Sequence, residues 1–174
     1  MQPLAQPERA PLSQRPRRIT AIATREDGEI MPIPGQPVSR VLILEDDSDI
    51  GAALALAVSG EEGFSVEVVA DVASCLDRLR ARGGNAVMPP FDVLLLDLIL
   101  RGGHLGTEVL RAAAQPGAAL RLPAVVVCTA HSRDYLTRHA PEIAASNVRV
   151  VRKPFDLDEL MRAVRLAALG ALGD

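Results

Sequence analysis

The chain has 174 residues, a formal net charge of -3 at pH 7 and 48% hydrophobic residues, a composition that suits one globular domain with a tail. No uninterrupted apolar stretch reaches the roughly 18 residues of a membrane span, and the amino terminus lacks the apolar core of a secretory signal. These absences predict a cytoplasmic protein. From residue 39 onward, 14 basic and 18 acidic residues offer no general basic surface for nucleic acid.

The first 38 residues differ in composition from the rest of the chain. They hold seven of the 13 prolines and no aromatic residue. Proline at this density removes backbone donors and blocks helices and sheet ladders. We therefore predict a disordered or extended tail over residues 1–38, with room for a short strand at residues 18–24.

From residue 40 the chain alternates apolar runs with amphipathic segments, which is typical of a parallel sheet covered by helices on both faces. The predicted strands lie at residues 41–44, 64–70, 93–100, 122–129 and 148–151. Between them we predict a helix capped by Ser48 or Asp49 that runs through Val58, and helices at 71–82, 106–114 and 132–145; a last helix is capped by Asp156. The apolar positions of the last helix that we expect to face the sheet are Leu157, Leu160, Met161, Val164 and residues 166–169.

The strand at 93–100 is apolar except for Asp97. Such a run is typical of a strand buried on both faces, where a carboxylate is costly to bury unless a cation pairs with it. Other predicted strands also end in polar side chains: one runs into Glu45 and Asp46, one ends at Thr129, and one leads to Lys153. If these strands are parallel neighbours, their carboxyl ends bring these groups to one rim of the sheet.

Four motifs, each after an apolar run, resemble the receiver domain of two-component response regulators. They are EDD at 45–47, LLLDL at 94–98, VVCTA at 126–130 and KPF at 153–155. The resemblance covers residues 39–172 and implies a flavodoxin-like, doubly wound sheet of five parallel strands in order 2-1-3-4-5 with five helices. No output domain is expected after the receiver domain.

The resemblance also assigns roles to single residues. Asp97 is the expected phosphoacceptor, with Thr129 and Lys153 as the partners of the phosphoryl group. Mg²⁺ is the expected cofactor: Asp46 and Asp97 are implied as direct ligands, Glu45 as a ligand through a bound water, and the Ile99 backbone carbonyl as the last protein ligand. Hard oxygen donors of this kind suit Mg²⁺, which screens charge during attack on phosphorus.

Two features bear on this assignment. The acids after the first strand also fit the start of a helix, where the helix dipole alone favours negative charge. Against that alternative stands Lys153, the one lysine among 19 basic residues, because a compact ammonium suits a single phosphoryl oxygen better than a planar guanidinium does. Pro154 after it resembles the family's Lys-Pro step, whose peptide bond is cis.

The chain also departs from the family pattern. Val150 stands where many receivers carry an aromatic residue that changes rotamer on phosphorylation, and valine cannot make that movement. The loop after Asp97 lacks the frequent proline at Arg101 and is one residue longer before Gly106. Ile99 and His131 occupy places that in this family flank the path of the hydrolytic water, and a bulky Ile99 predicts slow loss of the phosphoryl group.

The leading prediction is a single-domain response regulator. It accepts a phosphoryl group on Asp97 from a sensor histidine kinase or a histidine phosphotransfer protein and signals through contacts with a downstream protein, without turnover of an external substrate. One alternative is a receiver fold that acts as a scaffold without phosphorylation. Val150 leaves this alternative open, whereas the full set of Glu45, Asp46, Asp97, Thr129 and Lys153 argues against it. Another is a phosphohydrolase of the haloacid dehalogenase kind, but that chemistry expects an acid where Ile99 stands.

Cys75 and Cys128 are far apart in the sequence and have no CxxC or His-rich neighbours. Both are predicted to be buried, reduced thiols rather than metal ligands.

Overall fold

The computed structural model describes residues 22–24, 30–32, 39–80, 90–100, 105–118, 120–131, 136, 143 and 148–171. Its strands are β1 (Ile22–Thr24), β2 (Ile30–Pro32), β3 (Ser39–Leu44), β4 (Phe64–Val69), β5 (Val93–Asp97), β6 (Ala124–Thr129) and β7 (Val148–Arg152). Its helices are α1 (Ser48–Ser59), α2 (Val72–Arg80), α3 (Thr107–Ala114) and α6 (Leu157–Ala171). None of these helices is long and apolar enough to cross a membrane.

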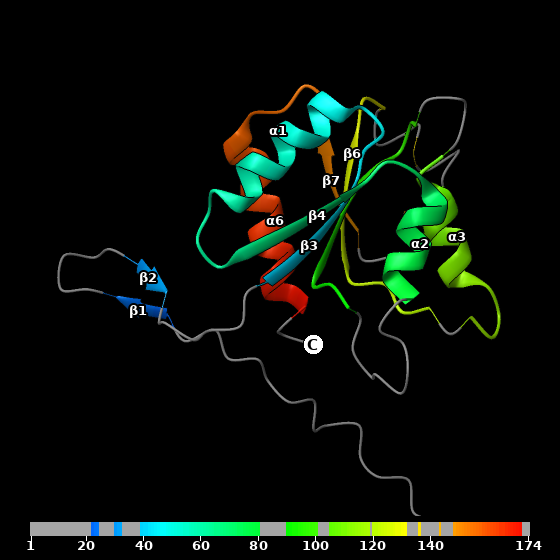
Figure 1. Cartoon of the computed structure of the whole chain (residues 1–174), viewed down its shortest axis with the longest axis horizontal. Coiled ribbons are helices and arrows are strands. Elements are labelled where there is room, and N and C mark those ends of the chain that lie inside the picture. Colours follow the sequence, from blue (N-terminus) through cyan, green and yellow to red (C-terminus); the bar gives the residue numbers. More distant parts are fainter. Residues whose placement is uncertain are drawn as a thin grey trace, which may run out of the picture.

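The main sheet has five strands in the order β4-β3-β5-β6-β7, and every neighbouring pair is parallel. Numbered from β3 as strand one, this is the order 2-1-3-4-5, so the predicted architecture is confirmed. Figure 1 shows α1 and α6 on one side of the sheet and α2 and α3 on the other. The order changes direction between β3 and β5, which places the carboxyl ends of these two strands on either side of a switch point.

Each face of the sheet has its own apolar core. Leu42 and Leu44 of β3 point toward α2 and α3, whereas Val41 and Ile43 point toward α1 and α6. All five residues of β5 are buried, as expected for a strand covered on both faces. Because each fully buried leucine contributes about 2 kcal/mol, the central strands supply much of the stability on which the site depends.

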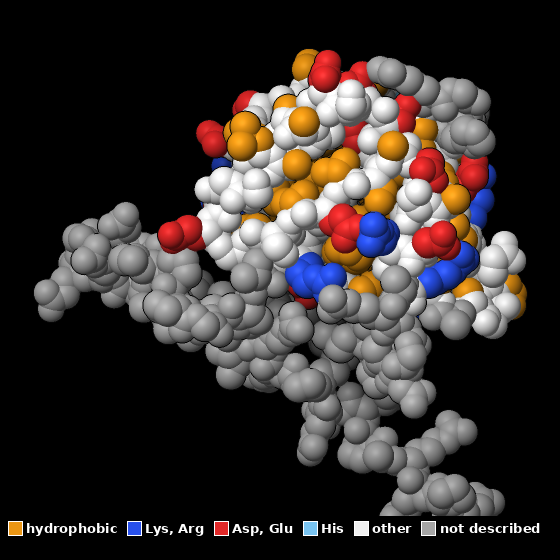
Figure 2. All heavy atoms as spheres, viewed as in Figure 1, with side chains coloured by type: hydrophobic (Ala, Val, Ile, Leu, Met, Phe, Trp, Pro, Cys, Tyr) orange, Lys and Arg blue, Asp and Glu red, His pale blue; other side chains and the backbone are white. Residues whose placement is uncertain are grey.

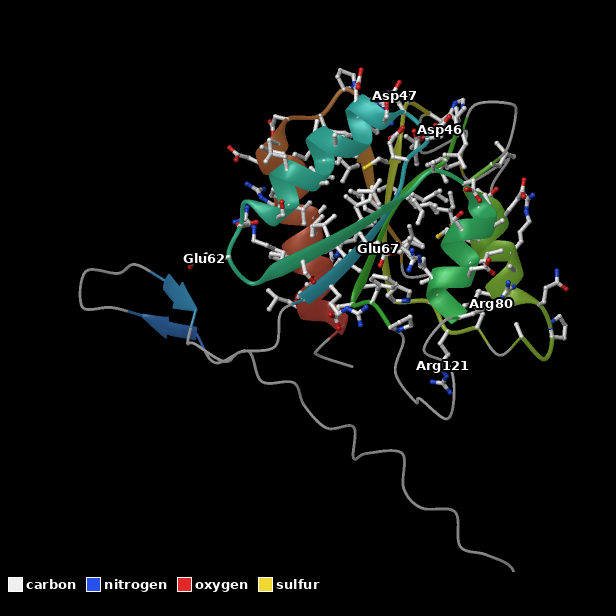
Figure 3. All side chains as sticks on the ribbon, viewed as in Figure 1. Asp46, Asp47, Glu62, Glu67, Arg80 and Arg121 are labelled. Atoms are coloured by element: carbon white, nitrogen blue, oxygen red, sulfur yellow. The ribbon has the colours of Figure 1, made fainter. Side chains whose placement is uncertain are left out.

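The edge strand β4 is more polar, as its alternating sequence predicts. Its Glu67 forms an ion pair with Arg78 of α2, with 2.8 Å between Oε1 and Nε. Figure 2 shows acidic and basic side chains side by side on the face that carries this strand, and Figure 3 labels Glu67 there. A charged edge of this kind discourages further strand pairing.

The capping residue of α1 is Asp47, so the prediction of Ser48 or Asp49 as the N-cap was wrong by one or two positions. The Asp47 Oδ1 accepts hydrogen bonds from the amides of Asp49 (3.0 Å) and Ile50 (3.2 Å). A carboxylate in extended backbone just before the helix reaches both unpaired amides. At α6 the predicted cap is confirmed, since Asp156 Oδ1 accepts a hydrogen bond from the Glu159 amide at 2.6 Å.

The predicted apolar face of α6 is partly correct. Leu160 and Val164 are fully buried, but Leu157, Leu166 and Leu169 are 52%, 43% and 53% exposed. Leu166 and Leu169 point away from the sheet, because four successive apolar positions at 166–169 cannot all lie on one face of a helix. Leu157 is the first residue of the helix.

Four of the five expected helices lie in the described part of the chain. The helix predicted at residues 132–145 falls outside it except for Leu136 and Ile143. These two residues are helical and buried in the same core as α2 and α3.

Within the predicted tail, β1 and β2 form an antiparallel hairpin. The strand allowed at residues 18–24 contains β1, but β2 was not predicted because it ends in Pro32 and lies in a proline-rich stretch. Both strands of a two-stranded sheet are edge strands, and an edge strand tolerates proline where no backbone N–H is needed for pairing. The rest of residues 1–38 lies outside the described residues.

Cys75 and Cys128 are free thiols with 0% and 1% exposure, as predicted. Burial raises the pKa of both thiols from an ordinary value near 9.0 to about 12, which lowers the thiolate fraction at neutral pH about a thousandfold. We therefore expect iodoacetamide to label neither thiol in the native protein at pH 8 and both in guanidinium chloride, as counted by intact mass. Rapid labelling of the native protein would contradict this assignment.

Candidate functional site

Four polar side chains from four strands meet at the carboxyl edge of the sheet. Asp97 is the last residue of β5 and Thr129 the last of β6, while Glu45 and Lys153 lie one position after β3 and β7. In Figure 3 the neighbouring Asp46 and Asp47 lie at this same edge, between β3 and the start of α1. These groups are far apart in the sequence, but the parallel strands bring them to the same edge of the sheet.

Lys153 bridges two buried carboxylates. Its Nζ lies 2.7 Å from Asp97 Oδ2 and 3.4 Å from Glu45 Oε2. The acid side chains are only 10% and 3% exposed, against 26% for the lysine. Burial of an unpaired carboxylate would be costly, so the ammonium makes this arrangement of acids tolerable.

The second oxygen of each carboxylate is held by the backbone. Asp97 Oδ1 accepts a hydrogen bond from the Ile99 amide at 3.2 Å, and Glu45 Oε1 accepts one from the Asp47 amide at 3.3 Å. Asp97 therefore presents a fixed carboxylate, with a cation on one oxygen and a peptide N–H on the other.

Two carboxylates share one ammonium at this site, and burial and these charges shift the pKa values of Glu45 and Lys153. Burial raises the pKa of Glu45, and the nearby Asp97 charge adds to the effect, although Lys153 acts in the opposite direction. For Lys153, burial alone would lower the pKa, but the hydrogen bond to Asp97 and the charges of both acids outweigh it and raise the pKa. The site thus favours additional positive charge.

A raised pKa for Glu45 means that its charged form is less favourable in the folded than in the unfolded chain. Without divalent ions at pH 7, Glu45→Gln is therefore expected to raise Tm, because the amide avoids the burial of charge. The gain should vanish below the ordinary pKa of glutamate, near 4.5, where the carboxyl is protonated in both folded and unfolded chains. Thermal melts at both pH values, with the exposed Glu62→Gln as control, test this. A lower Tm at pH 7 would show that the pairing with Lys153 outweighs burial.

Thr129 is fully buried. Its Oγ1 accepts a hydrogen bond from the His131 amide at 3.1 Å, and its carbonyl accepts one from the Lys153 amide at 2.8 Å. The main chain thus couples the positions of the hydroxyl and the ammonium. The Lys153–Pro154 peptide is cis, as the resemblance implied.

The oxygen donors at this edge of the sheet suit a divalent ion only in part. Among the described residues, no three Asp, Glu, His or Cys side chains converge into a ready-made metal centre. The structure does bring Glu45 and Asp97 together, with Lys153 between them, and Asp46 stands next to Glu45 in the chain. Hard oxygen donors and uncompensated negative charge suit Mg²⁺ in their chemistry.

Val150 is partly buried and packs against the core on the side of α2 and α3. The structure therefore shows an ordinary packing role for the valine that stands three positions before Lys153. Ile99, in contrast, is 47% exposed at the mouth of the site. The residues 101–104 of the unusual loop lie outside the described part of the chain.

Two residues of the site were not predicted from the sequence. Asp47 was grouped with the other acids, but its side chain caps α1. Gly106 was noted only as a helix start, whereas it lies against the backbone of Asp97. An acid just before a helix is a known capping pattern and could have indicated the role of Asp47. No sequence pattern in a single chain reveals that Gly106 lies against Asp97.

Residues 41–165 match the family model described as response regulator receiver domain. The alkaline phosphatase synthesis transcriptional regulatory protein SphR of Synechococcus elongatus is 27% identical over 139 residues, which are 78% of this chain and 51% of SphR. The chain therefore spans about half the length of this curated relative.

Solved structures show the same fold. A sensor protein from Polaromonas sp. JS666 is 27% identical, with a TM-score of 0.61 and coverage of 78% of this chain and 99% of that one. A CheY-like response regulator receiver domain protein from Methanospirillum hungatei JF-1 is 21% identical, with a TM-score of 0.57 and coverage of 77% and 96%. At that identity the second likeness shows the fold alone.

Proposed function

Because the chain belongs to the response regulator receiver domain family, we propose that Asp97 accepts a phosphoryl group from the phosphohistidine of a sensor kinase or phosphotransfer protein. The observation that carries the proposal is the ion pair of 2.7 Å between Asp97 and Lys153, at the carboxyl end of a central strand. Receiver domains are phosphoacceptors, so the product of the reaction is the modified protein itself.

In the proposed reaction a carboxylate oxygen of Asp97 attacks phosphorus, the P–O bond forms, and the P–N bond to the donor histidine breaks. Lys153 then transfers its contact from Asp97 Oδ2 to a phosphoryl oxygen. The Thr129 hydroxyl oxygen accepts a hydrogen bond from the His131 amide. The hydroxyl proton of Thr129 is therefore available for a hydrogen bond to a second phosphoryl oxygen. Both groups stabilise charge on the transferred phosphoryl group.

We propose Mg²⁺ as the cofactor. Asp46, Asp97 and the Ile99 carbonyl would hold it directly, and Glu45 would act through a bound water. When bound, the ion screens the repulsion between the carboxylate and the incoming phosphoryl group. The Glu45 and Asp97 carboxylates share a single ammonium, that of Lys153, and the negative charge that this leaves supports the proposal.

Signalling is proposed to occur through contacts with a downstream protein in the cytoplasm. Because Val150 is a partly buried valine packed against the core, an aromatic rotamer switch at this position is not part of the read-out we propose. The same observation favours a second candidate function, a scaffold with a receiver fold that binds partners without phosphorylation. Metal-dependent phosphorylation of Asp97 separates the two.

The test is incubation of the purified protein with acetyl phosphate and Mg²⁺, followed by intact mass and by peptide mapping after borohydride reduction of the acyl phosphate. We expect one added phosphoryl group, located on Asp97, and none in the presence of EDTA. An unmodified protein under conditions where it binds Mg²⁺ would favour the scaffold.

A further inference from the structure

We infer that Gly106 is a positioning residue for the phosphoacceptor. Its missing side chain lets the returning limb of the loop after β5 lie directly against the Asp97 backbone, and this contact holds the Ile99 peptide groups in the site. The inference rests on the proposed function for its consequence in catalysis. Its structural part rests on the contacts of Gly106 itself.

The need for glycine comes from space and not from conformation. Gly106 has φ -56° and ψ -23°, which any residue adopts. A Cβ at this position would lie 2.0 Å from the Asp97 carbonyl oxygen and 3.0 Å from Leu96 Cδ1. The nearest atom belongs to the backbone of the buried strand β5, so a side chain here must displace either the loop or the end of that strand.

Two backbone contacts join the limbs of the loop. The Gly106 amide donates a hydrogen bond to the Leu98 carbonyl at 3.1 Å, and Ile99 forms an antiparallel bridge with Leu105. The outgoing limb at 98–99 and the returning limb at 105–106 therefore form a short ladder. Movement of Gly106 would be passed directly to Ile99.

Ile99 is the link from this ladder to the reacting group. Its amide donates a hydrogen bond to Asp97 Oδ1 at 3.2 Å, and its carbonyl is a proposed ligand of Mg²⁺. A shift of the ladder would thus turn the carboxylate and move one metal ligand together. Supporting groups of this kind typically change metal affinity or activity by about 10–100-fold when altered.

A purely structural role for Gly106 would have a different signature. The residue precedes α3 and provides no side-chain cap, so its replacement could cost folding stability alone. In that case the molecules that remain folded would bind Mg²⁺ normally and react at the normal rate. Metal affinity and rate per folded molecule therefore distinguish positioning from packing.

The test compares Gly106→Ala with Gly170→Ala, whose added Cβ meets no atom within 4 Å. Mg²⁺ is titrated while the amide resonances of both variants are followed by NMR, and phosphorylation by acetyl phosphate is measured at saturating Mg²⁺. For Gly106→Ala we expect a shifted Ile99 amide resonance, a Kd for Mg²⁺ raised about tenfold and a slower reaction. Gly170→Ala should match the wild-type protein in its Ile99 amide resonance, its Kd for Mg²⁺ and its rate of phosphorylation.

Wild-type affinity and rate in folded Gly106→Ala would overturn the inference. If that variant does not fold, Leu105→Gly replaces it: Leu105 is 40% exposed, and glycine loosens the ladder without a clash. An unchanged Kd and rate in Leu105→Gly would also overturn the inference. If the wild-type protein were never phosphorylated, the proposed function would fail, while the Mg²⁺ titration and the Ile99 resonance would still test the positioning role.

Discussion

Asp97→Asn is expected to leave the protein folded and to abolish its phosphorylation. The amide keeps the volume of the carboxylate and still offers an oxygen to the Ile99 amide, which lies 3.2 Å from Oδ1. It lacks the negative charge that attacks phosphorus. Loss of the attacking group should lower the rate of phosphoryl incorporation at least about a thousandfold.

The measurement is intact mass over time with acetyl phosphate and Mg²⁺. Asp158→Asn in the first turn of α6 is the matched control, because it removes one exposed carboxylate that is not among the groups of the site. It should react like the wild-type protein. Incorporation that persists in Asp97→Asn, on Asp46 or Thr129, would reject Asp97 as the acceptor.

The clustering of Glu45, Asp97, Thr129 and Lys153 could be predicted because each follows an apolar run. In a parallel α/β sheet all strands point the same way, so groups after the strands share one edge. The structure places Lys153 Nζ 2.7 Å from Asp97 Oδ2, which agrees with the prediction that these groups meet at one rim of the sheet. The roles of these residues in phosphoryl transfer stay predictions.

Local details were harder to predict. Three consecutive acids at 45–47 look alike in the sequence, yet Asp47 caps a helix while Glu45 is buried against Lys153. The difference arises because the chain passes from the end of β3 to the start of α1 within these three residues. Composition does not reveal which acid takes which place. The pairing of β1 with β2 was not predicted for a related reason. Proline density describes a segment as a whole, and it does not exclude two short strands whose outer edges tolerate proline.

The contact of Gly106 with Asp97 illustrates a limit of another kind. Glycine before a helix has several ordinary explanations, among them a tight turn or a permissive cap. Only the three-dimensional path of the loop shows that a Cβ would meet the Asp97 carbonyl oxygen. A long-range steric constraint of this type leaves no local pattern in one sequence.

Lys153→Met is expected to damage both stability and function. Methionine fills a similar volume but leaves Glu45 and Asp97 as buried acids without their cation. Leaving such groups unpaired should lower the free energy of unfolding by about 2 kcal/mol in the absence of divalent ions. Loss of a charge that stabilises the transferred phosphoryl group should slow phosphorylation by about 100–1,000-fold.

The design separates charge from packing. Arg152→Met removes the neighbouring cation, which is exposed on β7. It should change neither the free energy of unfolding nor the rate of phosphorylation. Mg²⁺ should restore much of the stability of Lys153→Met, since the ion supplies positive charge to the same acids, but it should not restore the rate.

The pH dependence gives an independent check on the same pair. Because the folded protein raises the pKa of Lys153 above its ordinary value of 10.5, the stabilisation is complete below that pH and is lost as the pH rises through the folded value. The stability difference between wild type and Lys153→Met, measured by denaturant unfolding without metal, should therefore be constant from pH 7 to 9 and shrink in strong alkali. A difference that is absent at pH 7 would mean that Lys153 does not compensate the two acids, and the electrostatic basis of the site would have to be abandoned.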